Sequence, residues 1–320
     1  MRSSSFDQAA CRRVLFWCLL CVLGALATPD AVRAQTHTAH SLDQVPALLQ
    51  SPEAKSNFNQ QIAGAPAPNS LGLHLPPALT AQAISNLMLP GNDKTPLNAV
   101  GAKPLPNEQD RYVAVVCLGG DIPKTADDTR CSQSGADNTL PLRAVLGVIE
   151  AKPGAPARLI AGPVTIDGMV NWRQTKLPSA PDALDDAKGD EVSPESFTGF
   201  DLAPYRISPD TTAIGLRGDW SAGYSGGGAE WTALYLFATV NGSLRQVLAV
   251  PMSSYQNIAG DWHKDGTRDH QITDVSNVLI VTPHAVDGHF DLLVKQRAGH
   301  AETLYRWSLA SADYQPVKQG

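Results

Sequence analysis

The sequence predicts an all-β fold, in which antiparallel strands build a sandwich or an irregular, propeller-like domain behind a Pro-rich N-terminal extension. From Arg111 onward, short runs of β-branched and aromatic residues alternate with turn-forming residues. Asn241-Gly242 and Asp287-Gly288 each separate two apolar runs, and such pairs accept the positive φ angles of a type I′ hairpin turn. The runs show no clean fixed period, which argues against a regular propeller.

The first 34 residues have the pattern of a secretory signal peptide. Arginines precede a short apolar run over residues 14–26, and Val32 and Ala34 occupy the small-residue positions before a cleavage site. The apolar run is too short to span a bilayer comfortably, and no second long run follows it. We therefore expect a cleaved signal and a mature periplasmic chain without a membrane span.

The charge of the mature chain limits its partners. Without the four arginines and two aspartates of the signal, 21 basic and 29 acidic residues remain, a net charge of −8. An acidic surface repels nucleic acid and attracts metal ions or basic proteins. We therefore expect no nucleic-acid partner.

Two cysteines remain after the signal, Cys117 and Cys131. In an oxidising compartment a single pair of cysteines indicates a disulfide. Their spacing does not match the C-x-x-C pattern of a redox or metal site. We expect a structural bridge that closes a loop of about 15 residues.

Residues 35–108 have the composition of an extension or linker. Stretches such as residues 64–70 are rich in Pro, Gly, Ala and Asn, and proline interrupts both helices and sheets. Short helical pieces are compatible with residues 41–63 and 76–89. We expect this segment to be partly disordered or to lie over the main domain.

The main domain, residues 109–320, is expected to consist of strands. The expected strands are 111–118, 142–151, 157–166, 211–220, 230–240, 244–252, 270–282, 289–297 and 302–310. Residues 178–195 interrupt this pattern with six acidic side chains and one lysine. That composition is typical of a solvated loop, and the alternative is an acidic arm that meets a basic partner.

Residues 259–272, AGDWHKDGTRDHQI, predict a calcium site. If Asp261 is position 1, the residues at the liganding offsets 3, 5, 7 and 9 of an EF-hand loop are His263, Asp265, Thr267 and Asp269. Gly266 stands at the turn position 6. The expected calcium shell is the three carboxylates, the Thr267 carbonyl and water.

Two features separate this stretch from an EF-hand. Position 12 is Ile272 rather than a bidentate glutamate, and the flanking segments have the pattern of strands. One alternative is a polar turn held only by Asx hydrogen bonds. Another is a zinc site built on His263 and His270, although zinc needs more nitrogen or sulfur ligands.

The stretch GDWSAGYSGGGAEW, residues 218–231, contains a literal G-x-S-x-G at residues 223–227. A serine-hydrolase nucleophile requires a helix after this turn, whereas the following residues alternate as in a strand. We interpret the stretch as a flexible partner-binding loop in which Tyr224 supplies an aromatic contact. The expected contact residues are Ser221, Gly223, Tyr224, Ser225, Gly226 and Gly227.

Residues 200–237 and 258–272 together resemble the periplasmic immunity proteins of bacteria that carry the bacteria-killing type IV secretion system. The resemblance covers roughly residues 110–317. It implies a largely β protein that binds calcium and inhibits a lysozyme-like effector. The loop itself is similar to the D-x-N-x-D-G-x-x-D calcium loops of FG-GAP and integrin-type proteins. The resemblance places the calcium ligands at Asp261, Asp265, Asp269 and the Thr267 carbonyl, with His263 where Asn or Asp is usual.

Other periplasmic lysozyme inhibitors plug the enzyme cleft with an S-G-x-Y loop, and residues 221–224 keep the Ser-to-Tyr spacing with the glycine one place late. A lysozyme-like enzyme works with two carboxylates, to which hydroxyl groups of Ser221 and Tyr224 can donate. We expect a non-enzymatic inhibitor of a lysozyme-like peptidoglycan hydrolase. The alternative is a calcium-stabilised, secreted adhesion or scaffold module without inhibitory activity.

Overall fold

The computed structural model describes residues 36–317 except 67, 124–129, 134–139, 175, 186 and 188. The expected signal peptide, residues 1–34, lies outside the described residues. The described residues belong to one compact unit. None of the helices in this part of the chain combines the length and the apolar character that crossing a membrane requires.

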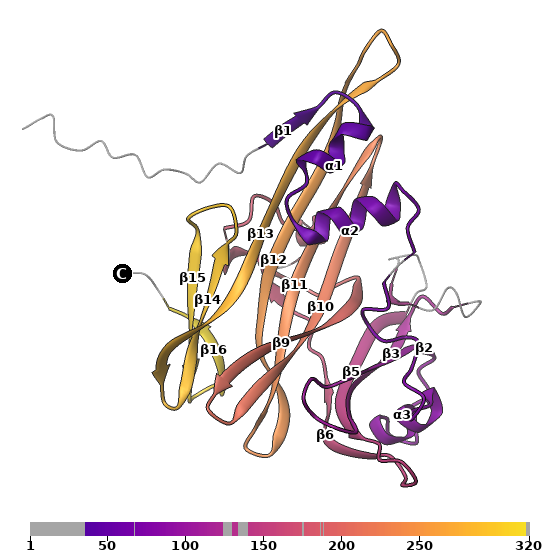
Figure 1. Ribbon diagram of the computed structural model, residues 1–320, viewed down its shortest axis with the longest axis vertical. Coiled ribbons are helices and arrows are strands. Elements are labelled where there is room, and N and C mark those ends of the chain that lie inside the picture. The colour runs from indigo at the N-terminus through magenta and orange to yellow at the C-terminus, as the bar shows by residue number, and fades with distance from the viewer. Residues whose placement is uncertain are drawn as a thin grey trace, which may run out of the picture. The chain divides into compact units, whose positions relative to one another are not determined.

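Among the described residues, ten strands form the largest sheet, and its strand pairs are antiparallel. The order across the sheet is β4–β9–β10–β11–β12–β13–β14–β15–β16, and β1 pairs with β13 (Figure 1). The bounds are β1 Thr36–Ala39, β4 Cys131–Ser132, β9 Ser196–Ser208, β10 Thr211–Tyr224, β11 Gly227–Val240, β12 Ser243–Trp262, β13 Arg268–Val286, β14 His289–Gln296, β15 Glu302–Ser308 and β16 Asp313–Pro316.

A second sheet has the order β2–β3–β5–β6, with bounds Leu97–Pro104, Arg111–Gly120, Leu140–Glu150 and Arg158–Thr165. The short strands β7, Val170–Asn171, and β8, Glu191–Val192, pair separately. The α-helices are α1 Val45–Leu48, α2 Pro52–Gln61 and α3 Ala81–Met88, and the described 3₁₀ turns are η1 Leu42–Gln44, η3 Trp172–Gln174 and η4 Asp182–Leu184.

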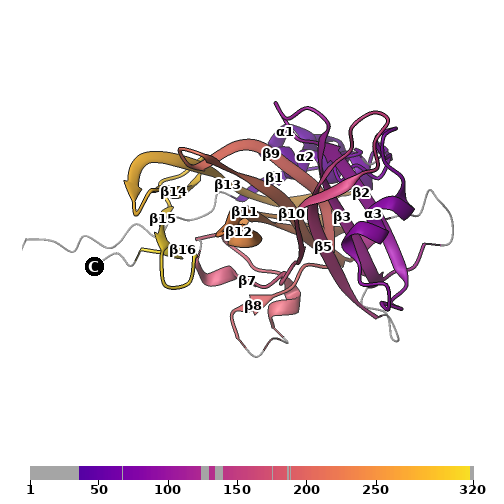
Figure 2. The ribbon, with the colours of Figure 1, turned by 90° about the horizontal axis from the view of Figure 1, so that it is seen from below.

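The two larger sheets share the main hydrophobic core. Trp220 and Trp231 of the ten-stranded sheet lie in one buried cluster with Val115 and Leu146 of the four-stranded sheet. The other face of the four-stranded sheet is covered by α3 through Ile84, in a separate cluster (Figure 2). The prediction of an antiparallel all-β fold is confirmed, and the two larger sheets contribute side chains to one shared core.

Two predicted hairpin turns are also confirmed. Asn241 and Gly242 connect β11 to β12 with φ angles of 51° and 79°, and Asp287 and Gly288 connect β13 to β14 with 52° and 78°. These left-handed angles at both central residues are the ones that a type I′ turn requires.

The expected boundary between an extension and the domain at residue 109 does not coincide with a structural boundary. Strand β2 pairs along its length with β3, and β1 pairs with β13 at the other end of the segment. The predicted helical regions contain α2 and α3. The segment folds with the domain because its apolar side chains, such as Ile84 and Val100, are buried against the sheets.

Helix α2 covers one face of the ten-stranded sheet. Ser51 caps it by accepting a hydrogen bond from the Ala54 amide at 3.0 Å, and Pro52 opens its first turn. Ala54 and Phe58, four residues apart, place their side chains on the same side of the helix, where they pack with Tyr255 of β12. The first residues of the described chain therefore build one wall over the sheet.

The Cys117–Cys131 disulfide is confirmed, with a Cα–Cα distance of 5.6 Å. Cys117 lies in β3 of the smaller sheet, and Cys131 lies in β4, which pairs with β9 of the larger sheet. The bridge therefore joins the two sheets.

Replacement of Cys117 and Cys131 by alanine is expected to lower the free energy of unfolding by about 3 kcal/mol, because the unfolded chain regains the entropy of an open loop. The midpoint of guanidinium unfolding measures this loss. Wild-type protein treated with a reductant should show a similar shift. An unchanged midpoint in both samples would contradict a stabilising role for the bridge.

Candidate functional site

The turn between β12 and β13 is a polar turn held by its own hydrogen bonds. The His263 amide donates to the Thr267 carbonyl at 2.8 Å, and the Gly266 amide donates to the His263 carbonyl at 3.1 Å. One carboxylate oxygen of Asp265 accepts from the Thr267 amide at 3.0 Å and from the Thr267 hydroxyl at 2.7 Å. These bonds lower the pKa of Asp265. Gly266 has a φ of 85°, as its place in the turn requires.

Asp269 accepts from two histidines rather than joining the other aspartates of the loop. Its Oδ1 lies 2.8 Å from Nε2 of His263 and 2.9 Å from Nδ1 of His40. Among the described residues, these three side chains are the group whose possible metal-ligating atoms all lie within 4.8 Å of one another. Asp261 and Asp265 do not belong to it.

This arrangement does not fit calcium. Calcium takes six to eight oxygen ligands, and the assembled group offers two imidazole nitrogens and one carboxylate. The Asp265 carboxylate is engaged by Thr267, as the alternative of an Asx-bonded turn predicts. Calcium binding at Asp261, Asp265 and Asp269 stays a prediction that this geometry does not favour.

The Gly-rich stretch forms a tight turn rather than a long flexible loop. Strand β10 continues to Tyr224 and β11 begins at Gly227, so Ser225 and Gly226 alone connect them. A Cβ on Gly227 would collide with the Asn257 carbonyl of β12. The glycines thus permit close contact between strands. Because Ser225 lies between antiparallel strands, the turn lacks the strand-to-helix geometry of a nucleophile elbow.

The two hydroxyl residues expected to face a partner already contact carboxylates of this chain. Ser221 donates from its amide to Glu195 Oε2 at 3.0 Å and from its hydroxyl at 3.4 Å. The Tyr224 hydroxyl lies 3.4 Å from both oxygens of Asp182. Both acids belong to the acidic stretch 178–195, and Asp182 and Glu195 therefore lie beside the last residues of β10. Partial burial and then the Asp182 charge raise the pKa of Tyr224.

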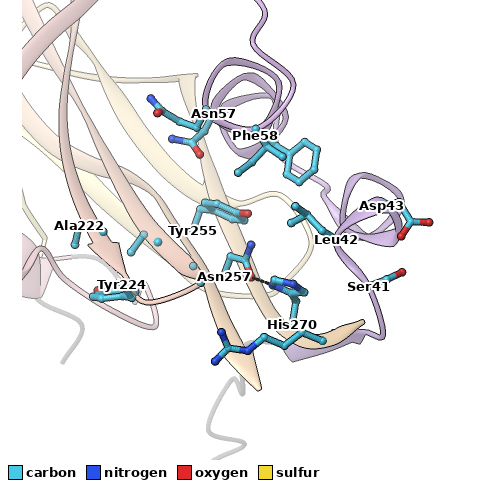
Figure 3. Close-up of a pocket in the computed structure, with 18 of the residues that line it drawn as sticks. Ser41, Leu42, Asp43, Asn57, Phe58, Ala222, Tyr224, Tyr255, Asn257 and His270 are labelled. Atoms are coloured by element: carbon cyan, nitrogen blue, oxygen red, sulfur yellow. Dashed lines mark hydrogen bonds between the residues drawn. The ribbon is translucent and has the colours of Figure 1, made fainter. Parts of the chain in front are cut away.

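A groove of about 870 Å³ lies between α2, the 3₁₀ turn η1 and the ends of strands β10 to β13 (Figure 3). Phe58 and Leu42 border it on one side, Tyr224 on another, and Tyr255 lies between them (Figure 3). Trp262, at the end of β12, completes the rim. On the floor, His270 Nδ1 lies 2.9 Å from Asn257 Oδ1.

The rim of the groove is unusually apolar for an exposed surface. The exposed fractions are 69% for Trp262, 51% for Ile62, 40% for Leu42 and 37% for Tyr224. The Arg268 guanidinium lies 5.2 Å from the centre of the Trp262 ring, which orients the ring. Large apolar side chains that gather in this way indicate an interaction surface.

The sequence predicts only part of this groove. The Gly-rich turn and the β12–β13 turn both line it, through residues such as Tyr224, Gly226 and Thr267. The wall formed by Leu42, Phe58 and Ile62 comes from the segment expected to be an extension or linker that is partly disordered or lies over the main domain. The Ser51-Pro52 start of a helix, followed by Ala54 and Phe58 at helical spacing, was the signal for that wall. Compared with protein-family models, curated proteins and solved structures, the chain matches none of them.

Proposed function

We propose that this chain is a periplasmic protein that inhibits a lysozyme-like peptidoglycan hydrolase. It would bind the hydrolase through the groove between α2 and the ends of β10–β13. The observation that carries the proposal is the exposed apolar rim formed by Leu42, Ile62, Tyr224 and Trp262 around one hollow. Burying such a rim against a partner removes apolar area from water, which drives association.

The kind of residue on the rim supports a protein partner. Tyrosine and tryptophan dominate the binding energy of protein interfaces because their rings bury a large area at low entropic cost. Tyr224 and Trp262 stand at the ends of neighbouring β-hairpins. The acidic side chains Asp43, Asp182 and Asp261 are exposed beside them. A basic hydrolase is therefore attracted to this end of the sheet.

The hydroxyl group of Tyr224 is the group proposed to contact the hydrolase. Its 3.4 Å contacts with Asp182 are at the long end of hydrogen bonding, so the phenol can exchange this carboxylate for one on a partner at little cost. In a glycosidase cleft the catalytic carboxylates are the available acceptors. A phenol bonded to one of them, with the ring in the sugar-binding cleft, excludes the substrate.

Tyr224→Ala is expected to weaken inhibition at least about tenfold, because it removes an aromatic contact from the rim. The measurement is the rate at which purified lysozyme-like hydrolases clear a peptidoglycan suspension, titrated with the full chain. Tyr224→Phe separates the phenol from the ring and should lose only part of the effect.

Leu309→Ala is the control, because Leu309 is 68% exposed and lies in the turn between β15 and β16, outside the groove. It should inhibit like the wild type. Equal inhibition by Tyr224→Ala and the wild type would rule out this contact. Complete absence of inhibition across the hydrolases would instead favour the adhesion or scaffold alternative.

A further inference from the structure

We propose that His40, His263 and Asp269 form a surface site for a divalent transition metal of the zinc type. The site goes beyond the proposed inhibitory function and does not depend on it. The sequence distributes its ligands over two distant segments, since His40 and Asp269 are 229 positions apart.

Strand pairing brings the three ligands together. Strand β1 pairs with β13 so that Ala39 lies opposite His270, which places the next residue, His40, beside Asp269. The turn between β12 and β13 returns His263 to the same carboxylate. Two independent backbone features therefore fix the two imidazoles around one oxygen. Neither imidazole needs a change of strand register to reach it.

The distances suit a small metal ion. Zinc binds histidine nitrogen and carboxylate oxygen at about 2.0–2.2 Å, so neighbouring ligands of a tetrahedral site lie about 3.3 Å apart. The two nitrogens lie 2.9 and 2.8 Å from Asp269 Oδ1 and within 4.8 Å of each other, so small side-chain movements bring the three atoms to these distances. Without a metal, the same atoms share hydrogen bonds.

The site is open on the side where a metal enters. The His40 side chain is 71% exposed and the His263 side chain is 38% exposed. Both line a small hollow together with Lys264, Asp265 and Thr267. Two imidazoles and one carboxylate leave a coordination position for water, as in catalytic rather than closed structural zinc sites. Nitrogen donors favour zinc, copper or nickel over calcium and magnesium.

Metal binding would tie the end of β1 to the β12–β13 hairpin. Thr267 lines both this hollow and the groove, so the site lies at the edge of the proposed binding surface. The ion therefore fixes the hairpin that carries Trp262. Its effect on the fold is measurable without any hydrolase.

Isothermal titration of the full chain, prepared without a histidine tag, tests the site with zinc chloride and with calcium chloride. Zinc should bind at one ion per chain, and calcium should give no saturable heat at the same sites. His40→Ala, His263→Ala and Asp269→Asn should each weaken zinc binding at least about tenfold, since even loss of an outer-shell partner costs that much in metal affinity. Zinc should raise the melting temperature of the wild type more than that of the three triad variants.

His300→Ala is the matched control, because His300 is exposed and lies outside the triad. It should bind zinc like the wild type. Melting curves without metal check that each variant folds. If His40→Ala does not fold, His40→Gln takes its place. Zinc affinity that is the same in the control and in all three triad variants would overturn the proposal. Calcium binding that depends on Asp269 would also overturn it.

Discussion

Replacement of Trp231 by alanine is expected to lower the free energy of unfolding by about 3–5 kcal/mol, the usual cost of removing a buried tryptophan. Trp231 is 1% exposed and lies directly across from Trp220 in the β10–β11 pair. Trp220 in turn contacts the Trp172 ring edge-on, with 5.2 Å between ring centres. Truncation therefore opens a cavity in the core that both large sheets share. Guanidinium unfolding measures the loss.

Two variants separate the parts of this effect. Trp231→Phe keeps a ring but loses the 2.9 Å hydrogen bond from the indole to the Ser179 hydroxyl. Ser179 keeps its 2.6 Å contact with the Ser254 hydroxyl, so this variant should cost clearly less than alanine. Trp262→Ala changes the same residue type at 69% exposure and should alter stability by about 0.5 kcal/mol or less. Equal losses in the alanine variants would contradict the assignment of the core.

The sequence pattern predicts strands best where the ladder is regular. The expected strand 289–297 matches β14 to within one residue, and β14 pairs with β15 without a register shift. The sequence pattern does not predict strand β9, because its pairing with β10 shifts register at three places and this breaks the alternation of buried residues. Strand β12 was expected to end at Met252. It continues to Trp262, because a register shift at Pro251 lets the ladder pass a residue without an amide proton.

The candidate site shows the same limit more sharply. Local spacing predicts the turn at Gly266 and offers the Asx bond of Asp265 as an alternative, because both depend on residues two or three positions apart. It gives no information about His40, which reaches Asp269 only through the pairing of β1 with β13. A liganding pattern read along one loop therefore assigned the carboxylates to calcium. In the folded chain, one of these carboxylates, Asp269, instead contacts the imidazoles of His40 and His263, which come from different segments.

A second feature that no local pattern predicts is a group of acidic side chains under α2. Asp219 of β10 and Glu230 of β11 lie on the sheet face that the helix covers. Glu53 lies in the first turn of α2, above them. One carboxylate oxygen of each lacks a hydrogen-bond partner. Arg217 pairs with Asp201 at 2.6 Å but reaches Glu53 only at 3.9 Å, so the positive charge does not balance the group.

Burial and the charges of Asp219 and Glu53 raise the pKa of Glu230 to about 8, against a smaller opposing effect of the Asn57 hydrogen bond. Burial also raises the pKa of Asp219 to about 6, although Thr198 and Arg217 oppose it. Both carboxyl groups therefore bind protons more tightly in the folded chain than in the unfolded chain. Between their unfolded and folded pKa values, the folded state holds more protons, so stability falls as pH rises.

Glu230→Gln is therefore expected to stabilise the protein at pH 8.5 and to leave it almost unchanged at pH 4.5, because glutamine never acquires the buried charge. A pKa that moves from 4.5 to about 8 corresponds to a gain on the order of 4 kcal/mol at the higher pH. Guanidinium unfolding at both pH values measures the difference.

Glu302→Gln, an exposed position on β15, is the control and should follow the wild type at both pH values. If Glu230→Gln keeps the pH slope of the wild type, Glu230 does not carry a buried proton in this pH range. If the slope flattens, the carboxyl group of Glu230 beneath α2 ionises as the pH rises. Asn57, which lowers the pKa of Glu230 and also lines the groove, then connects that charge to the proposed binding surface.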